Sequence, residues 1–313
     1  MNKISKIFVA GHTGLAGSAL MRKLQKSGYN NLVCRTHNEM DLRRQQKVED
    51  FFRRVTPEYI FISAAKVGGI LGNYNYPADF IYDNLIIQTN IIHSAYMTKV
   101  KKLLFLGSSC IYPKHCKQPM KEESLLSGYL EPTNEPYAVA KIAGIKTCQS
   151  YNRQYGTRFI SVMPTNLYGP NDNFDLKTSH VLPALIRKFH EAKITGSKEV
   201  EIWGSGKPRR EFLHVDDMAD ACLFIMENYE GNDIINIGTG KDLTIYELAY
   251  MIAKIVGFKA NLKFDTSKPD GTLLKRLDVS RLKKMGWEAQ IQLEHGIETT
   301  YEWFRTNASK ILS

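Results

Sequence analysis

The first 170 residues of the chain alternate short, nearly continuous apolar runs with longer stretches in which apolar residues recur at helical spacing. Apolar runs of this length are typical of strands buried on both faces, and their alternation with helices predicts a doubly wound parallel sheet. The predicted strands are Lys6–Ala10, Asn31–Arg35, Glu58–Ser63, Lys102–Gly107 and Arg158–Pro164. The predicted helices are Leu15–Ser27, Arg43–Arg54, Pro77–Met97 and Glu135–Tyr155. The pattern therefore predicts an α/β fold.

The character of the sequence changes at about Gly169. A polar loop starting at Asn171 is followed by a predicted helix over residues 181–192 and a predicted strand over residues 199–203. A further helix starts at His214, a core strand follows near residue 234, and the tail ends in an amphipathic helix. We therefore predict a Rossmann-type domain over residues 1–170, to which residues 211–240 return, and a smaller interleaved C-terminal α/β lobe over residues 171–313.

Composition places the chain among ordinary globular proteins, with 43% hydrophobic and 24% charged residues in 313. The five cysteines are odd in number and scattered, which argues against a disulfide framework and favours a reducing cytoplasm. Cys110 and Cys116 lack a matching second pair, so we expect no metal site. The chain enters its first predicted strand at Lys6, without signal-peptide flanks, and no apolar run reaches transmembrane length. We expect a cytoplasmic protein with no membrane partner.

The net charge of +10 raises the question of nucleic acid as a partner. The basic residues are spread along the chain and form no dense Lys/Arg stripe with interleaved aromatic residues. A site for anionic phosphates, together with ordinary surface lysines, accounts for the excess. We therefore expect no nucleic-acid partner.

A glycine-rich turn follows the first predicted strand and opens the first predicted helix. Its residues are Gly11, His12, Thr13, Gly14, Leu15, Ala16 and Gly17. Glycines at this spacing permit a tight turn and close approach of the backbone to a pyrophosphate, which the helix N-terminus attracts. A tight turn without a ligand is the alternative.

Arg35 ends the second strand where a site for NAD usually places an acid, and a guanidinium there suits a ribose 2′-phosphate. The sequence thus favours NADPH over NADH, unless Arg35 is only a solvated surface residue.

Tyr137 and Lys141 lie four residues apart on a predicted helix, so both side chains share one face. An ammonium group near a phenol lowers the phenol pKa from about 10 towards working pH. A tyrosine tuned in this way can give a proton to a carbonyl oxygen while a hydride reaches the carbon. Ser108 follows the fourth strand and could donate to the same oxygen, or could simply cap the strand end. A Tyr–Lys pair at this spacing is common by chance, so its value depends on the glycine turn and Ser108.

Longer segments carry a family resemblance. They are residues 106–114, 131–146, 150–156, 164–170 and 268–272. Together with Ser108, Tyr137, Lys141 and the glycine turn, they resemble the extended short-chain dehydrogenase/reductases, and within these the GDP-L-fucose synthase family, nearly end to end. The resemblance implies an NADPH-dependent homodimer that epimerises C3 and C5 of GDP-4-keto-6-deoxy-D-mannose and reduces C4. One departure is His12, where the family is expected to have arginine.

The resemblance implies that residues 1–170 bind NADP(H) and that the second lobe binds a nucleotide sugar. The implied cofactor-binding residues are Gly11, His12, Thr13, Gly14, Leu15, Ala16, Gly17, Arg35, Leu106, Gly107, Lys141, Pro164, Thr165, Asn166, Leu167 and His180. It further implies that Cys110 is the base and His180 the acid of the epimerisation, beside the reducing group Ser108, Tyr137 and Lys141. Without the resemblance, the residues themselves favour a buried apolar cysteine at position 110 and a surface or helix-start histidine at position 180.

The resemblance also marks substrate-binding positions in the second lobe, namely Lys188, Trp203, Arg210 and Asp270. Two of these are cations suited to a diphosphate, although neighbouring Arg187 could compete with Lys188. Trp203 taken alone could be a core residue. The loop over residues 66–69 after the third strand either approaches the substrate or cofactor or is a simple turn.

By resemblance, the helix over residues 135–155 and the one after Pro77 pair with their copies in a second subunit. We expect apolar groups such as Ile86, Ile91, Ile145 and Tyr151 on their outward faces, with some of them packed on the sheet instead.

Three other functions stay open. A related GDP-sugar 4-keto reductase, of colitose or deoxyheptose type, would epimerise only C5 or neither centre. A UDP- or dTDP-sugar epimerase or dehydratase would retain its dinucleotide through a redox-neutral cycle. A non-catalytic NADP-binding scaffold would not require Ser108, Tyr137 and Lys141 together.

Overall fold

Six parallel strands form the central sheet of the larger lobe, in the order β10-β5-β4-β3-β1-β2. Their bounds are β1 Ile7–Ala10, β2 Leu32–Val33, β3 Tyr59–Ile62, β4 Lys102–Leu106, β5 Phe159–Pro164 and β10 Ile235–Ile237. The computed structural model describes residues 1–259, 261–268 and 270–311, so Pro269 of the segment 268–272 lies outside the described residues. The predicted α/β fold with a doubly wound parallel sheet is confirmed. Strand β2 is shorter than predicted because it lies at the sheet edge, where only Leu32 and Val33 pair with β1.

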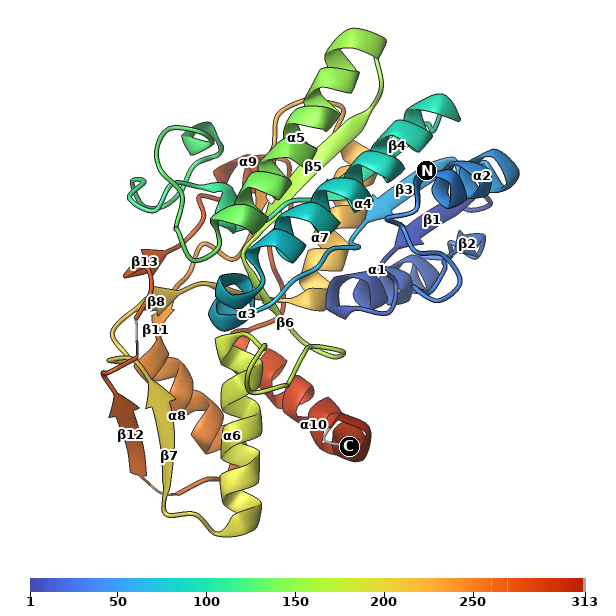
Figure 1. Cartoon of the computed structure of the whole chain (residues 1–313). Coiled ribbons are helices and arrows are strands. Elements are labelled where there is room, and N and C mark those ends of the chain that lie inside the picture. Colours follow the sequence, from blue (N-terminus) through green and yellow to red (C-terminus); the bar gives the residue numbers. More distant parts are fainter. Residues whose placement is uncertain (260, 269, 312–313) are drawn as a thin grey trace.

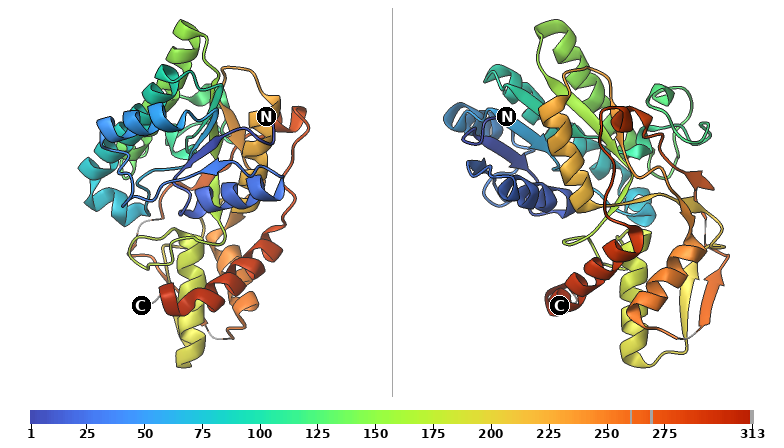
Figure 2. Two further views of the ribbon diagram at one scale, coloured as in Figure 1. Left: turned by 90° about the vertical axis from the view of Figure 1, so that its right-hand side faces the viewer. Right: turned by 180° about the vertical axis from the view of Figure 1, so that it is seen from behind.

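Helices cover both faces of this sheet (Figure 1, Figure 2). One face carries α2 (Gln45–Val55), α4 (Pro77–Met97) and α5 (Glu135–Tyr155), and the other carries α1 (Leu15–Lys26) and α7 (Val215–Asn228). Each face has its own apolar core, as the continuous burial of the strands requires. Local sequence sets the helix ends: Pro77 suits the first position of α4, and Gly156 ends α5 with φ of 65°.

Helices α4 and α5, which we expect to pair with their copies in a second subunit, lie side by side. Two of the residues expected on their outward faces point towards the core instead. Ile91 and Ile145 are fully buried in the core between these helices and the sheet. Tyr82 and Met97 of α4 and Tyr155 of α5 are exposed instead. The exposed apolar side chains of these helices are therefore aromatic residues and methionine rather than isoleucine.

The smaller lobe packs helices against a two-stranded sheet, in the lower part of Figure 1. Helices α6 (Val181–Thr195), α8 (Ile245–Val256) and α10 (Leu293–Ile311) enclose an apolar core with β7 (Glu199–Trp203) and β12 (Asn261–Asp265). Burial alternates along β7, where Val200 and Ile202 face the core, as expected for a strand with one solvated face. The remaining elements are α3 Ile70–Asn75, α9 Ser280–Lys284, β6 Asn166–Tyr168, β8 Arg209–Arg210, β9 Phe212–His214, β11 Leu243–Thr244, β13 Leu274–Lys275, and the short 3-10 turns η1 Ser109–Ile111 and η2 Glu122–Ser124.

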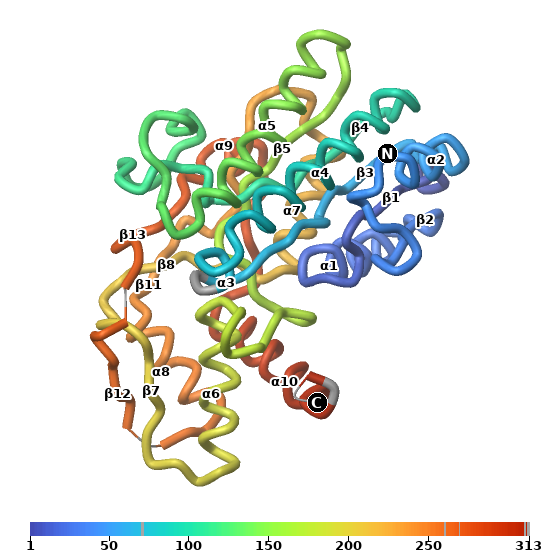
Figure 3. The backbone as a smooth tube through the Cα atoms, viewed as in Figure 1, coloured from blue at the N-terminus to red at the C-terminus, as the bar shows by residue number. Residues whose placement is uncertain are grey.

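The chain crosses between the lobes several times, as the tube in Figure 3 shows. Strand β5 runs into β6, which pairs with β9, while β8 pairs with both β11 and β13. The buried carboxylate of Glu211, between β8 and β9, accepts hydrogen bonds from the backbone N–H groups of Thr239, Gly240 and Leu277. These crossings bring residues of the second lobe to the carboxyl ends of the parallel strands, where open α/β sheets bind ligands.

Candidate active site

The glycine turn has the close packing that the sequence predicts. A Cβ at Gly17 would lie 2.0 Å from the carbonyl oxygen of Gly11, and one at Gly11 would lie 2.6 Å from the backbone nitrogen of Ala64. Gly14, in contrast, meets only one ordinary contact at 3.7 Å, and no side chain caps the N-terminus of α1. The turn thus leaves an open glycine and free helix N–H groups, an arrangement that fits the pyrophosphate of a dinucleotide.

Arg35 and His12 lie near each other beyond the end of β2. The guanidinium of Arg35 stacks over the Phe51 ring at 5.4 Å and donates to the Cys34 carbonyl at 2.7 Å. The buried Nδ1 of His12 has no hydrogen-bond partner. Both residues also lie close to Glu39. Hydrogen bonds from Thr36 lower the pKa of Glu39, and the charges of Arg35 and His12 lower it by a smaller amount. Arg35 is therefore held half-buried, with part of its guanidinium still able to contact a ligand.

Ser108, Tyr137 and Lys141 come together at the carboxyl end of β4. Lys141 is only 3% exposed, and its Nζ donates to the carbonyl oxygen of Leu106 at 2.7 Å. The same ammonium group lies 5.8 Å from the centre of the Tyr137 ring, on the same face of α5. The Ser108 hydroxyl accepts a hydrogen bond from the backbone N–H of Cys110 at 3.2 Å, so this serine caps the turn η1 as well as facing Tyr137.

The predicted lowering of the Tyr137 pKa is wrong for this structure. Burial, and then the neighbouring Cys110 thiol, raise the pKa of Tyr137, and the Ser108 hydroxyl opposes them only in part. Burial also lowers the pKa of Lys141 to about 7, because a lysine with one carbonyl partner loses most of its hydration. Helical spacing brought the two residues to one face, but desolvation decides both pKa values.

Cys110 is half-buried, and donors surround its sulfur. Lys275 Nζ donates to Cys110 Sγ at 3.3 Å, and Asn134 Nδ2 donates to it at 3.4 Å. Burial raises the pKa of this thiol, but the charge of Lys275, hydrogen bonds from Ser108 and Lys275, and the charge of Arg210 outweigh it and lower the pKa. The arrangement is that of an activated thiol rather than an apolar core cysteine.

His180 stands at the N-terminus of α6 and keeps access to solvent. Partial desolvation by the protein atoms around it, and then the charge of Lys275, lower the pKa of His180. The segment before it rests on the loop 66–69, where the N–H of Gly69 donates to the Thr178 carbonyl at 2.7 Å. That loop therefore supports the segment that carries His180.

The four expected substrate-binding residues occupy the lobe side of the site. Trp203 is 44% exposed on β7, so it is no core residue, and the ammonium groups of Lys188 and Lys268 lie 5.2 and 5.7 Å from its ring centre. Arg187 is held by Glu191 at 2.6 Å, which leaves Lys188 as the cation beside the indole. Asp270 accepts hydrogen bonds from the backbone N–H and hydroxyl of Ser205 at 2.6 and 2.7 Å.

Arg210 connects the lobe side of the site with the reacting groups. Burial lowers its pKa, which the nearby Asp270, Cys110 and Glu131 partly offset. A guanidinium placed between the lobe and the thiol is suited to bind an anionic group of a substrate that spans both.

Sequence reasoning missed two groups that contact the candidate base. Asn134 precedes the predicted helix that carries Tyr137, and its position within the segment 131–146 could have drawn attention to it. Lys275 belongs to none of the segments that carried the resemblance, and it lies 165 residues from Cys110 in sequence. No local signal could have linked those two residues.

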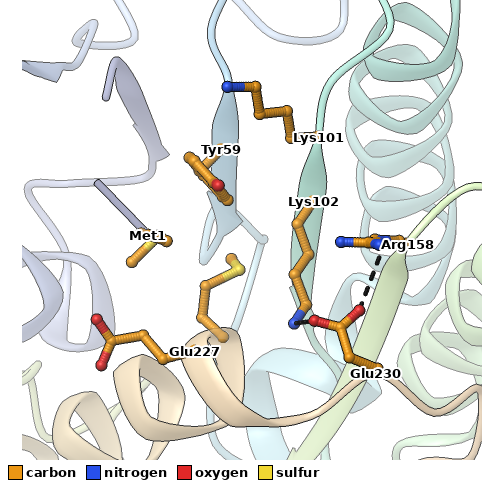
Figure 4. A pocket seen from close by; sticks show the side chains of 8 residues that line it. Met1, Tyr59, Lys101, Lys102, Arg158, Glu227 and Glu230 are labelled. Atoms are coloured by element: carbon orange, nitrogen blue, oxygen red, sulfur yellow. Dashed lines mark hydrogen bonds and ion pairs between the residues drawn. The ribbon is translucent and has the colours of Figure 1, made fainter. Parts of the chain in front are cut away.

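A pocket of about 290 Å³ lies at the opposite edge of the sheet, near the starts of β3, β4 and β5 (Figure 4). Its cations are neutralised: Lys102 and Arg158 pair with Glu230, and Lys101 pairs with Glu58. It contains none of the predicted site residues. Among the described residues, no group of His, Cys, Asp and Glu could hold a metal ion, and no helix is long and apolar enough to span a membrane.

A glycine turn at the carboxyl edge of a parallel sheet, with a serine, tyrosine and lysine beside it, defines a dinucleotide-dependent oxidoreductase. The comparison with known proteins identifies the family within this class. The chain belongs to the NAD dependent epimerase/dehydratase family, whose model matches residues 7–238. The resemblance to extended short-chain dehydrogenase/reductases is thereby confirmed.

Individual relatives extend over nearly the whole chain. GDP-L-fucose synthase 1 of Arabidopsis thaliana is 59% identical, covering 98% of this chain and 95% of its own. GDP-L-fucose synthase of Escherichia coli strain K12 is 55% identical, covering 97% and 98%. Among solved structures, a GDP-6-OMe-4-keto-L-xylo-heptose reductase from C. jejuni is 45% identical with a TM-score of 0.94, covering 98% and 99%. A GDP-L-fucose synthetase from Naegleria fowleri bound to NADP is 30% identical with a TM-score of 0.93, covering 100% and 98%.

Proposed function

We propose that the protein converts GDP-4-keto-6-deoxy-D-mannose to GDP-L-fucose, by epimerisation at C3 and C5 and NADPH-dependent reduction at C4. The observation that carries the proposal is one cluster in which the donor-surrounded Cys110 sulfur adjoins the Tyr137 phenol. A base for a carbon acid and an acid for a carbonyl oxygen are the two groups that this pair of reactions requires.

Epimerisation uses the acidity that a C4 ketone gives to the hydrogens on both flanking carbons. The Cys110 thiolate removes the proton from C3 or C5, and an enolate forms. His180 returns a proton to the opposite face of the same carbon, which inverts the centre. The lowered pKa of Cys110 supports the first of these roles, because more of the thiol is deprotonated at neutral pH.

Reduction uses the second set of groups. Tyr137 donates its phenolic proton to the C4 oxygen, and its raised pKa keeps that proton in place until it is needed. Ser108 donates to the same oxygen, while Lys141 orients the nicotinamide ribose from its buried position. When bound, NADPH supplies the hydride that reaches C4.

We assign the NADP(H) site to the glycine turn, Arg35 and His12, with residues 106–107 and 164–167, Lys141 and His180 along the strand ends. The open face of Gly14 and the uncapped N-terminus of α1 support it. We assign the GDP-sugar site to Lys188, Trp203, Arg210 and Asp270. The exposed indole with two ammonium groups near its ring supports that part, because an aromatic face and cations suit a nucleoside diphosphate.

We also propose that the protein is a cytoplasmic homodimer. The exposed aromatic residues Tyr82 and Tyr155 on the paired helices α4 and α5 support an interface between two copies. We retain the division into residues 1–170 with 211–240 and residues 171–313, which the pairing of β10 with β5 supports.

Deuterium exchange tests the epimerase proposal directly. The protein is incubated in D₂O with GDP-4-keto-6-deoxy-D-mannose and no NADPH, and deuterium at C3 and C5 is followed by NMR. We expect exchange at both carbons in the native protein and a strong loss in Cys110→Ser, because a serine hydroxyl is a far weaker base. Cys34→Ser is the matched control. Undiminished exchange in Cys110→Ser would contradict the assignment of the base.

The same experiment distinguishes the second candidate, which the similarity to a heptose reductase favours. Exchange at C5 alone, or at neither carbon, with intact NADPH oxidation would indicate a GDP-sugar 4-keto reductase that epimerises one centre or none.

A further inference from the structure

Three elements from distant parts of the sequence meet at the sulfur of Cys110. Cys110 lies in η1, Asn134 precedes α5, and Lys275 ends β13. The amide of Asn134 and the ammonium of Lys275 both donate to the sulfur, at 3.4 and 3.3 Å. All three residues line one small cavity of about 40 Å³.

Two cations near Lys275 have carboxylate partners. Lys114 pairs with Glu131 at 3.1 Å, and Arg276, next to Lys275, pairs with Asp242 at 3.0 Å. Among the described residues, no carboxylate lies within ion-pair distance of Lys275, and the thiol is the one side chain to which it donates. A half-buried ammonium group without a carboxylate is stabilised by a negative charge on its remaining partner, which here means a thiolate.

We propose that Lys275 is a positioning residue that holds the Cys110 thiol in its deprotonated form, ready to act as a base. The inference rests on the proposed epimerase function, which gives that base its task. Asn134 completes the arrangement by donating from a neutral group, so Lys275 supplies the charge and Asn134 supplies orientation.

Several other groups near the thiol also affect the pKa of Cys110. Arg210 adds a second positive charge and Ser108 adds a donor, while the Tyr137 phenol stays neutral because its pKa is raised. Glu131 is neutralised by Lys114. The charge of Lys275 also lowers the pKa of His180. Loss of Lys275 should therefore move the titrations of Cys110 and His180 in the same direction, to higher pH.

Lys275→Met and Lys275→Arg test the proposal, with Lys117→Met as the matched control at an exposed lysine of a nearby loop. The alkylation rate of Cys110 by iodoacetamide is measured against pH by peptide mass spectrometry, with Cys34 as an internal reference thiol. We expect the midpoint for Cys110 to rise by about one to three pH units in Lys275→Met, as for loss of a charge within 4–6 Å. The midpoint should stay near the native value in Lys275→Arg and Lys117→Met.

Deuterium exchange into the substrate gives the second measurement. In Lys275→Met, exchange should fall at neutral pH by about the factor by which the thiolate fraction falls, and should recover as the pH is raised. A merely structural role for Lys275 would give a loss that pH does not rescue. Should Cys110 resist the reagent, the thiolate absorbance difference between Lys275→Met and its Cys110→Ser double variant provides the same midpoint.

An unchanged Cys110 midpoint in folded Lys275→Met would overturn the proposal. Lys275→Gln, which keeps a polar side chain, replaces the methionine variant if that variant fails to fold. A shifted midpoint without substrate exchange in the native protein would instead contradict the proposed function and leave the role of Lys275 intact.

Discussion

Gly69→Ala should impair epimerisation without touching a reacting group. The φ of Gly69 is −66°, so alanine meets no backbone strain, but its Cβ would lie 2.5 Å from the carbonyl oxygen of Ser179. Ordinary contact begins near 3.4 Å, so about 0.9 Å must be taken up. The loop that carries Gly69 is pinned by hydrogen bonds from Asn73 to Gly68 and between Asn84 and Lys66. Ser179 and the adjoining His180 should therefore move.

A displacement of about 1 Å can reduce a rate about a hundredfold, so we expect deuterium exchange at C3 and C5 to fall by about 10- to 100-fold. NADPH affinity, measured by fluorescence titration, should change much less than the exchange rate, because His180 is only one of the proposed cofactor contacts. Gly72→Ala is the matched control, because its Cβ would meet only Phe80 at 3.8 Å and it lies in α3, the short helix whose N-cap is Gly69. Normal exchange in a folded Gly69→Ala protein would refute the idea that this loop positions His180.

Three further substitutions test two residues of the site and one buried carboxyl group outside the residues assigned to it. Tyr137→Phe removes the proton donor, and NADPH oxidation should fall by about 10²- to 10⁴-fold while NADPH binding persists; near-normal turnover would exclude Tyr137 as the acid. Arg35→Ala should weaken NADPH about ten- to hundredfold by loss of a charge-assisted bond and leave NADH nearly unaffected, as KM values would show; equal effects would mean that Arg35 points elsewhere. Burial raises the pKa of Asp172 to about 7, and its Oδ2 has no hydrogen-bond partner. The folded state thus holds that proton more tightly, and stability falls as pH rises from about 4 through about 7. Asp172→Asn should raise the free energy of unfolding by at most about 4 kcal/mol near pH 8 and by little near pH 4, in denaturant titrations; a gain that does not depend on pH would contradict this.

The sequence by itself determined the features whose signals are contiguous. The strand at residues 6–10 with its glycine turn and the helix that carries Tyr137 and Lys141 are set by spacing within a few residues. The change in sequence character at about Gly169 predicted a second, smaller lobe. Family-like segments marked Cys110 and His180 as the candidate base and acid without any knowledge of their surroundings.

Only the tertiary structure decided the chemistry of these groups. Lys275 reaches Cys110 across 165 residues, and Gly69 supports the segment before His180 across more than a hundred. Such contacts depend on where separate elements pack, which no local pattern encodes. The pKa of Tyr137 gives the clearest case: sequence spacing placed a cation on its face of the helix, but burial reversed the expected direction. Spacing determines which side chains share a face, whereas the charge state of each depends on how much water the packed fold leaves around it.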